Sequence, residues 1–206
     1  MAQAESATYP VTIRGDLTEP INRWLFLFKW LFVIPHLIVL VFLYVGFVVS
    51  WVVSFFAILF TGKYPKGLFD YNVGVLRWSW RVGFYSYQAL GTDKYPPFSL
   101  QKQDDYPADL DAQYPENLSR GLVLIKWWLL AIPHYLIVGA FDGGLGYRYG
   151  GLQLALVLFA AIGNLFNGAY PKDIFAFAMG INRWAYRVAG YAALFTDKYP
   201  PFSIAR

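Results

Sequence analysis

The two histidines of the chain, His36 and His134, are the side chains best suited to chemistry. Each follows a proline in the apolar phrase Ile-Pro-His. Because proline lacks an N–H, it leaves a helix carbonyl unbonded one turn earlier. An imidazole can ligate haem iron, carry a proton, or hydrogen-bond a quinone or a lipid headgroup. The alternative is that each histidine only satisfies its interrupted helix, or sits at headgroup level beside Trp30 and Trp128. We expect no obligatory cofactor; one site shared by the two histidines, or haem between them, is the alternative.

Other catalytic patterns are missing from the sequence. It has no Gly-x-Ser-x-Gly elbow, no His-Glu-x-x-His pair, no phosphate-binding loop ending in Lys-Ser or Lys-Thr, and no cysteine. No cluster of metal ligands stands out either, so we expect neither a catalytic nor a metal site. The cations lie within apolar sequence, which favours lipid over nucleic acid as their partner. The sequence therefore predicts a protein that is not an enzyme.

The composition indicates a membrane. Hydrophobic residues make up 57% of the chain and charged residues 15%, whereas charged residues are about a quarter of an ordinary soluble domain. The chain also holds eight Trp, sixteen Tyr and eighteen Phe, and aromatic rings are enriched where hydrocarbon meets water. The first ten residues show no signal peptide, so the first apolar segment is expected to direct insertion.

The chain contains an internal duplication, which is the main guide to its organisation. The phrase TDKYPPFS occurs at 92–99 and again at 196–203, and Arg-Trp-x-x-Arg-Val occurs at 77–82 and 183–188. Together with the two Ile-Pro-His phrases, these matches define two copies. The predicted organisation is a tail at 1–8, a first membrane repeat at 9–100, an acidic linker at 101–113 that lies outside the core, and a second membrane repeat at 114–206.

These three shared blocks resemble a family of bacterial membrane proteins known only as a domain of unknown function. The resemblance covers nearly the whole chain, twice. It implies a bacterial integral membrane protein and carries no activity. The second copy differs from the first by the insert FDGGLGYRYGG at 141–151.

The insert predicts how the apolar segments cross the membrane. In the first copy, residues 25–60 form 36 nearly unbroken apolar residues, whereas one span needs about 20. In the second copy the matching stretch is split into 122–140 and 152–166, because a polar glycine-rich loop cannot lie in hydrocarbon. By homology we expect a turn at 44–46 in the first copy. Each copy is then a transmembrane hairpin.

Charge favours these hairpins over a single membrane crossing by each copy, and it also orients them. Nearly all Lys and Arg fall on one side of the membrane, which the positive-inside rule makes cytoplasmic. We therefore expect a multi-pass protein of the bacterial inner (plasma) membrane with both termini and residues 104–111 cytoplasmic. Residues 147–149 are expected outside.

A third helix is expected in each copy, at 68–90 and 175–195, with a narrow polar stripe on an otherwise apolar surface. We expect these helices to lie along the cytoplasmic leaflet and to place arginines on lipid headgroups. The competing interpretation is a membrane-spanning helix whose arginines form ion pairs. The arginines concerned are Arg77, Arg81, Arg183 and Arg187.

The repeated phrase TDKYPPFS is expected to end each third helix, because two prolines cannot continue it. Its aspartate is expected to reach back to the arginines of its own copy. The phrase is either a terminating turn or a partner-docking motif. Its residues are Asp93, Tyr95, Pro96, Pro97 and Phe98 in the first copy, and Asp197, Tyr199, Pro200, Pro201 and Phe202 in the second.

These observations predict an all-α membrane protein in which two copies of a hairpin plus an amphipathic helix are related by a pseudo-twofold axis. Three function classes fit this arrangement. The first is a non-enzymatic scaffold or accessory subunit that binds lipids and partner membrane proteins, or self-associates. The others are a small transporter or channel, for which internal repeats are typical, and an electron-transfer subunit that uses the two histidines.

Overall fold

A computed structural model of the chain describes residues 9–142 and 151–205. The described part is mostly helical, with one pair of short strands. In chain order the elements are strand β1 (Val11–Gly15), the 3-10 turn η1 (Leu25–Leu27), α1 (Lys29–Thr61), α2 (Lys66–Tyr85), strand β2 (Ala108–Ala112), the 3-10 turn η2 (Leu122–Leu124), the π-helical segment η3 (Lys126–Leu130), α3 (Ile132–Asp142), α4 (Leu152–Asn167) and α5 (Lys172–Ala192).

The two strands form an antiparallel ladder between α2 and α5. Its register pairs Val11 with Ala112 and Ile13 with Leu110. Leu110 is fully buried. The predictions of an all-α chain, and of a linker outside the core at 101–113, were therefore wrong for 108–112. The phrase ADLDA alternates apolar and acidic residues, but it is short and rich in aspartate, which disfavours strands, and β1 supplies the partner that stabilises it.

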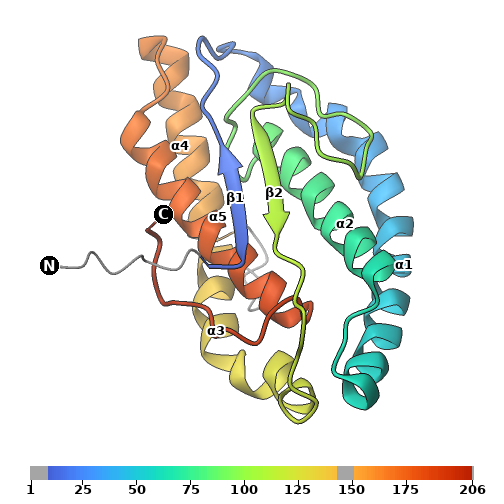
Figure 1. Cartoon of the computed structure of the whole chain (residues 1–206). Coiled ribbons are helices and arrows are strands. Elements are labelled where there is room, and N and C mark those ends of the chain that lie inside the picture. The colour runs from blue at the N-terminus through green and yellow to red at the C-terminus, as the bar shows by residue number, and fades with distance from the viewer. Residues whose placement is uncertain (1–8, 143–150, 206) are drawn as a thin grey trace, which may run out of the picture.

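Helices flank this ladder on both sides (Figure 1). α2 packs against β2, and α5 packs against β1. α1 lies outside α2, while α3 and α4 lie outside α5. From either edge of the molecule to the ladder, the order of elements is therefore the same. An apolar outer helix comes first, then an inner helix, and then a strand. Each outer layer comes from the apolar stretch of its own copy.

α1 runs unbroken through the position where a turn was predicted. Gly46 lies inside the helix, and a Cβ built on it would clash with the hydroxyl of Tyr71. The same tyrosine donates to the Leu43 carbonyl at 2.8 Å. This glycine therefore admits a neighbouring helix and does not mark a turn, so the hairpin prediction was wrong for the first copy.

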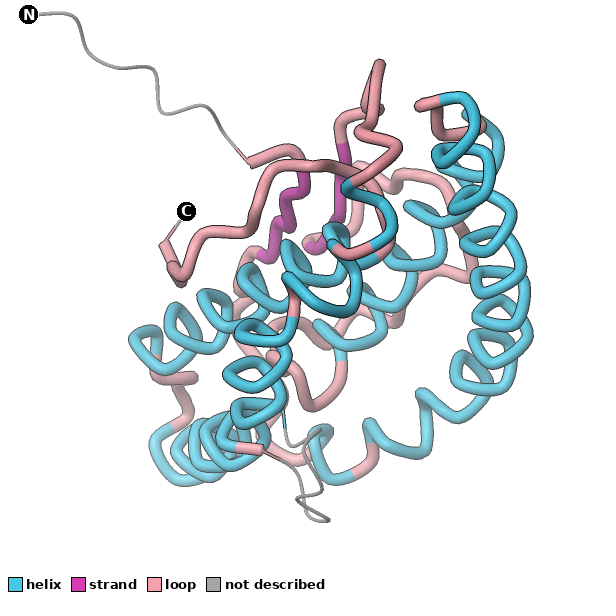
Figure 2. The backbone as a smooth tube through the Cα atoms, turned by 90° about the horizontal axis from the view of Figure 1, so that it is seen from below, coloured by secondary structure: helices cyan, strands magenta, loops and turns pink. Residues whose placement is uncertain are grey.

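α1 ends at Gly62, whose left-handed backbone (φ 74°) lets its N–H bond the Ile58 carbonyl. α4 ends in the same way at Gly168, with φ 72°. Between its ends α1 is curved, and Figure 2 shows it as a wide arc on the right-hand side of the molecule. In the second copy two helices, α3 and α4, stand in place of α1. The predicted loop between them, with the outside position 147–149, lies outside the described residues.

The second copy also contains a π-helical segment, η3, just before its Ile-Pro-His phrase. The chain has one residue more between Lys126 and His134 than between Lys29 and His36. A π-helical turn holds one extra residue. The π-helical segment therefore accommodates the extra residue, so that Lys126 and His134 occupy the positions equivalent to Lys29 and His36.

α2 and α5 are core helices along most of their length, and their exposed residues lie in their first two turns. In α2, Trp80, Arg81 and Phe84 are fully buried, and most of the other residues of the helix are also buried. α5 is buried along its middle in the same way. The prediction of interfacial helices was wrong, because the outer helices cover the faces that were expected to meet lipid.

Candidate functional site

His36 lies in an aromatic cage built from three segments of the first copy. Trp78 of α2 donates its Nε1–H to His36 Nδ1 at 3.0 Å. Phe98 stacks on the imidazole with ring centroids 3.9 Å apart, and Tyr95 lies tilted against it at 4.9 Å. The histidine side chain is fully buried. The phrase TDKYPPFS thus folds back over α1 and closes the cage.

The second copy builds the same cage around His134. Trp184 of α5 donates to His134 Nδ1 at 3.1 Å, Phe202 stacks at 4.1 Å, and Tyr199 lies at 4.8 Å. The interplanar angles agree as well, at 86° between histidine and tryptophan in both copies. Two sequences that differ at many positions therefore converge on one arrangement.

The tryptophan bond fixes the tautomer of each histidine. An indole N–H can only donate, so Nδ1 must accept and the ring proton lies on Nε2. Among the described residues, Nε2 makes no hydrogen bond of regular geometry in either copy, although the Pro200 carbonyl interacts weakly with His134. Each histidine is thus a neutral donor enclosed by aromatic rings.

The ring contacts of the described residues join each histidine only to its own copy. His36 contacts the aromatic residues of 78–98, and His134 those of 184–202. The structure therefore holds two separate cages and does not bring the histidines into contact. The stacked phenylalanine covers one face of each imidazole, and Nδ1 is already occupied.

A buried lysine fastens each repeated phrase to the start of its outer helix. Lys29 Nζ lies 2.9 Å from Asp93 and donates to the Thr92 carbonyl at 2.6 Å. Lys126 repeats both contacts, with Asp197 at 2.7 Å and the Thr196 carbonyl at 3.1 Å. Both lysine side chains are fully buried. The prediction that the aspartates reach the arginines was wrong, because the lysines take them.

The lysines and tryptophans of these sites were not found from the sequence. Lys29 and Lys126 stand alone at the start of long apolar stretches, and a charge in that position needs a buried partner. That was a usable signal for the Lys–Asp pair. Trp78 and Trp184 carried no such signal, because many tryptophans of this chain suit an interface equally well.

The tyrosines of the phrase bind the interrupted helix directly. Tyr95 donates its hydroxyl proton to the Phe32 carbonyl, and Tyr199 does so to the Leu130 carbonyl, both at 3.1 Å. Each acceptor lies three residues before the helix proline, in the turn that proline loosens. The paired prolines Pro96–Pro97 and Pro200–Pro201 keep the phrase extended over this turn. We name each phrase with its lysine, histidine and tryptophan a clamp.

The arginine pair of the first copy is neutralised by strand β2. Asp109 Oδ1 lies 3.1 Å from Arg77 Nε and 3.3 Å from Arg81 Nη2. Asp111 adds a longer contact of 3.7 Å to Arg77. Arg81 also donates to the carbonyls of Ser99 and Gln101. These arginines therefore bind the end of their own clamp and a neighbouring strand.

The arginine pair of the second copy meets different neighbours. Arg187 donates to the carbonyls of Ser203 and Ala205, at 3.2 and 2.9 Å, as Arg81 does in the first copy. Arg183 donates to the Ile204 carbonyl. Strand β1 has Thr12 and Arg14 where β2 has Asp109 and Asp111. Among the described residues, no carboxylate lies within ion-pair distance of Arg187.

Tyr9 and Tyr106 close the two arginine sites in the same way. Tyr9 donates to the Lys198 carbonyl at 3.0 Å, and Tyr106 donates to the Lys94 carbonyl at 3.2 Å. Burial raises the pKa of both tyrosines above the ordinary value, so both hydroxyls stay protonated donors. The second copy thus begins structurally at Tyr106, earlier than the sequence matches indicated.

The clamps suit positioning better than catalysis. Most of their polar atoms form hydrogen bonds or ion pairs within the clamp or with the apolar outer helix. No group of three or more potential metal ligands occurs among the described residues. The arginine site of the second copy differs from the clamps, because its cations line an open cavity.

Comparison with known proteins agrees with the duplicated motifs. No curated protein and no solved structure matches the chain. A family described as a domain of unknown function, DUF4389, matches residues 23–99 and 145–203, which together are more than half of the chain. Both matched segments end at the serine that closes a clamp, Ser99 and Ser203. The chain belongs to the DUF4389 family.

Proposed function

We propose that the protein is a non-enzymatic integral membrane scaffold or accessory subunit whose apolar outer surface binds lipids and partner membrane proteins or further copies of itself. One observation carries this proposal. α1 is long and apolar enough to cross a membrane, yet only 17% of its most apolar stretch is buried inside the protein. Water does not stabilise so large an apolar surface, whereas lipid does.

The exposed apolar side chains continue along the whole of α1. From Trp30 to Thr61 the sequence has no charged residue. The exposed set on this helix includes Leu37, Ile38, Val41, Phe42, Val45, Val48, Val49, Val52, Val53, Phe56 and Phe60. The outer helices of the second copy expose a similar set, Leu136, Leu152, Phe159, Ile162 and Phe166. Both outer layers therefore suit a hydrocarbon environment.

The contacts between the copies favour a particular membrane arrangement. The ladder pairs Ile13 with Leu110, which are equivalent positions of the two copies. Tyr64 donates to the Ala193 carbonyl, and its equivalent Tyr170 donates to the Ala89 carbonyl. These reciprocal pairs support a pseudo-twofold axis through the ladder. We place this axis along the membrane normal, so that equivalent residues lie at equal depth.

It follows from this axis that α1 enters and leaves the membrane on one side. The Leu118 N–H at the start of the second copy donates to the Gly62 carbonyl at the end of α1. Asn164, near the end of α4, donates to the Ile21 carbonyl at the start of the first copy. Because both copies begin at equal depth, both outer layers also end at that depth. The outer helices are then arches within the membrane, and this arrangement replaces the predicted hairpins.

Basic residues stand at the ends of these arches. Arg23 and Arg120 precede the two outer layers, and Lys63 and Lys172 follow them. By the positive-inside rule, this side faces the cytoplasm. The strand ladder and both described chain ends then lie at the cytoplasmic face of the bacterial plasma membrane.

Alkaline carbonate extraction tests the embedded surface. The full-length protein is expected to stay with the membrane pellet, because apolar contact does not depend on salt or pH as surface charge does. Release into the supernatant would overturn the proposal. Purification in mild detergent after cross-linking in cells tests the scaffold role: a partner protein or a second copy should remain attached, and recovery of the monomer alone would contradict that role.

A further inference from the structure

The second copy keeps the arginines of the first copy but exchanges the groups that neutralise them. Arg77 and Arg81 share the carboxylate of Asp109. Thr12, which is neutral, stands at the equivalent position beside the second pair, and Arg14 replaces the acidic Asp111. The first site thus gains two carboxylates from its strand, while the second gains a hydroxyl and a further cation.

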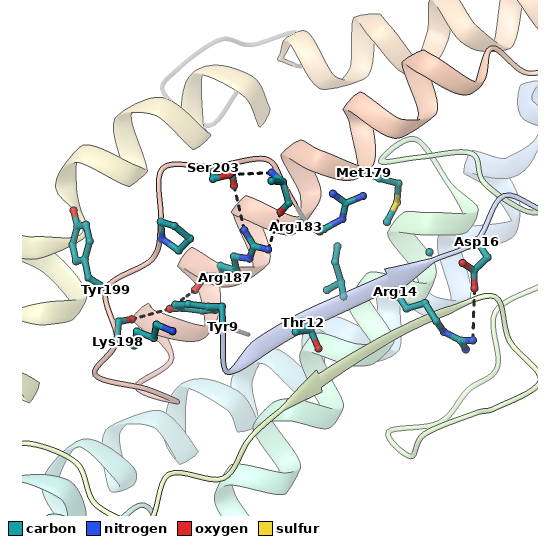
Figure 3. A pocket seen from close by; sticks show the side chains of 14 residues that line it. Tyr9, Thr12, Arg14, Asp16, Met179, Arg183, Arg187, Lys198, Tyr199 and Ser203 are labelled. Carbon is teal, nitrogen blue, oxygen red and sulfur yellow. Dashed lines mark hydrogen bonds and ion pairs between the residues drawn. The ribbon is translucent and has the colours of Figure 1, made fainter. Parts of the chain in front are cut away.

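An open cavity of about 830 Å³ lies at the second site, between β1, α5, the second clamp and the residues that follow this clamp (Figure 3). Among the described residues, its lining includes four cationic ones, Arg14, Arg183, Arg187 and Lys198, and one acidic one, Asp16. Asp16 pairs with Arg14 at 3.6 Å, and its side chain is 65% exposed. Tyr9, Thr12 and Ser203 add hydroxyl groups to the wall.

Arg187 is the residue of this site that most favours a bound anion, because it is a buried cation. The residue is only 9% exposed, and its guanidinium donates to two backbone carbonyls but meets no carboxylate among the described residues. In Arg81, the nitrogen that bonds the Gln101 carbonyl also lies 3.3 Å from Asp109. A buried guanidinium without a countercharge is unfavourable. An oxyanion placed where the first copy has its Asp109 carboxylate would supply that countercharge.

We propose that this cavity binds a phosphate group, either of a lipid headgroup or of a soluble phosphate ester. Arginine forks with nearby hydroxyl groups recognise tetrahedral oxyanions through several charge-assisted hydrogen bonds. The cavity lies on the ladder side of the molecule, where the cytoplasmic face is proposed, and lipid phosphates and soluble esters both reach that face. The proposal rests on Arg187 and on the exchange of Asp109 for Thr12, and it holds whether or not the apolar surface binds partner proteins.

The first copy supplies the decisive variant. Thr12→Asp places the carboxylate of the first site into the second, and Thr12→Asn is its neutral control of nearly equal size. Binding is measured on the full-length protein in detergent with glycerol 3-phosphate, and by co-sedimentation with phosphatidylcholine vesicles that do or do not contain phosphatidate. Thermal unfolding is recorded for each variant with and without glycerol 3-phosphate.

The wild-type protein and Thr12→Asn should bind, and glycerol 3-phosphate should raise their melting temperatures. Thr12→Asp should weaken binding about tenfold or more, because its own carboxylate occupies the site and repels the anion. Without ligand it should melt no lower than Thr12→Asn, and it should not respond to glycerol 3-phosphate. Binding to phosphatidate vesicles alone identifies a lipid source, and binding to glycerol 3-phosphate alone a soluble one. Equal binding by Thr12→Asp and Thr12→Asn, or no binding of either probe by the wild type, overturns the proposal.

Discussion

The clamps of the two copies make the same contacts at nearly the same distances. The copies differ in their outer helices and in the charges beside their arginines. The histidine–tryptophan bonds measure 3.0 and 3.1 Å, and the lysine–aspartate pairs measure 2.9 and 2.7 Å. In contrast, α1 is one helix of 33 residues where the second copy has α3 and α4. The clamp is therefore the conserved architectural unit of this chain, and the outer helix and the strand are its variable parts.

The charge difference between the copies should give the largest effect. Asp109→Asn leaves Arg77 and Arg81 without their shared carboxylate, so we expect a loss of about 3–5 kcal/mol in the free energy of unfolding. Asp111→Asn is the matched control and should cost less than about 1 kcal/mol, because an exposed ion pair contributes little. Denaturant titration in detergent measures both. Equal losses would show that Asp109 does not neutralise the buried pair.

Equivalent substitutions in the two clamps should lower the stability of the protein by equal amounts. Asp93→Asn and Asp197→Asn each leave a buried lysine without its countercharge, and each should destabilise the protein by about 3 kcal/mol. The double variant Lys29→Met with Asp93→Asn should recover part of this loss, because no charge is then buried. Thermal unfolding compares the four proteins. A large effect in one copy only would contradict the equivalence of the clamps.

The histidines should act separately, since each lies in its own cage. His36→Gln and His134→Gln each disturb one indole hydrogen bond and one aromatic stack, for which we expect about 1–2 kcal/mol. The loss in the double variant should equal the sum of the single losses within about 0.5 kcal/mol. A strongly non-additive cycle would point to one site shared between the copies.

The left-handed glycines that end α1 and α4 should give the smallest effect. Gly62→Ala and Gly168→Ala each force a Cβ into a conformation with φ above 70°, which costs about 1 kcal/mol. Gly67→Ala is the control, because a Cβ there meets no atom within 4 Å. Melting temperatures of the three variants test this. A loss at Gly67 as large as at Gly62 would remove the conformational explanation.

The sequence predicted the copies and their motifs, because identical phrases carry identical contacts. It also predicted the apolar stretches, whose composition alone marks them. The repeated phrase was correctly expected to fold back on its own copy, but its aspartate was assigned to arginine. Lys29 was the better candidate, since a lone cation at the start of an apolar helix has few other partners.

Other features could not be predicted from local patterns. Strand β2 exists because β1, far away in the chain, offers it a ladder. α1 stays helical through Gly46 because Tyr71 of a neighbouring helix fills the space beside that glycine. The buried position of α2 depends on the helix outside it and the strand inside it. Each of these outcomes is decided by tertiary contacts that a sequence window does not contain.

The central claim is that α1 enters and leaves the membrane on the same side, and its two ends test this most directly. The chain has no cysteine, so Thr18→Cys and Lys63→Cys each introduce one exposed thiol, before and after the arch. Asp104→Cys serves as the reference for the ladder side. A membrane-impermeant maleimide is applied to intact cells and to inverted vesicles. We predict that all three thiols react in inverted vesicles and are protected in intact cells; labelling of Thr18→Cys and Lys63→Cys from opposite sides would contradict the account.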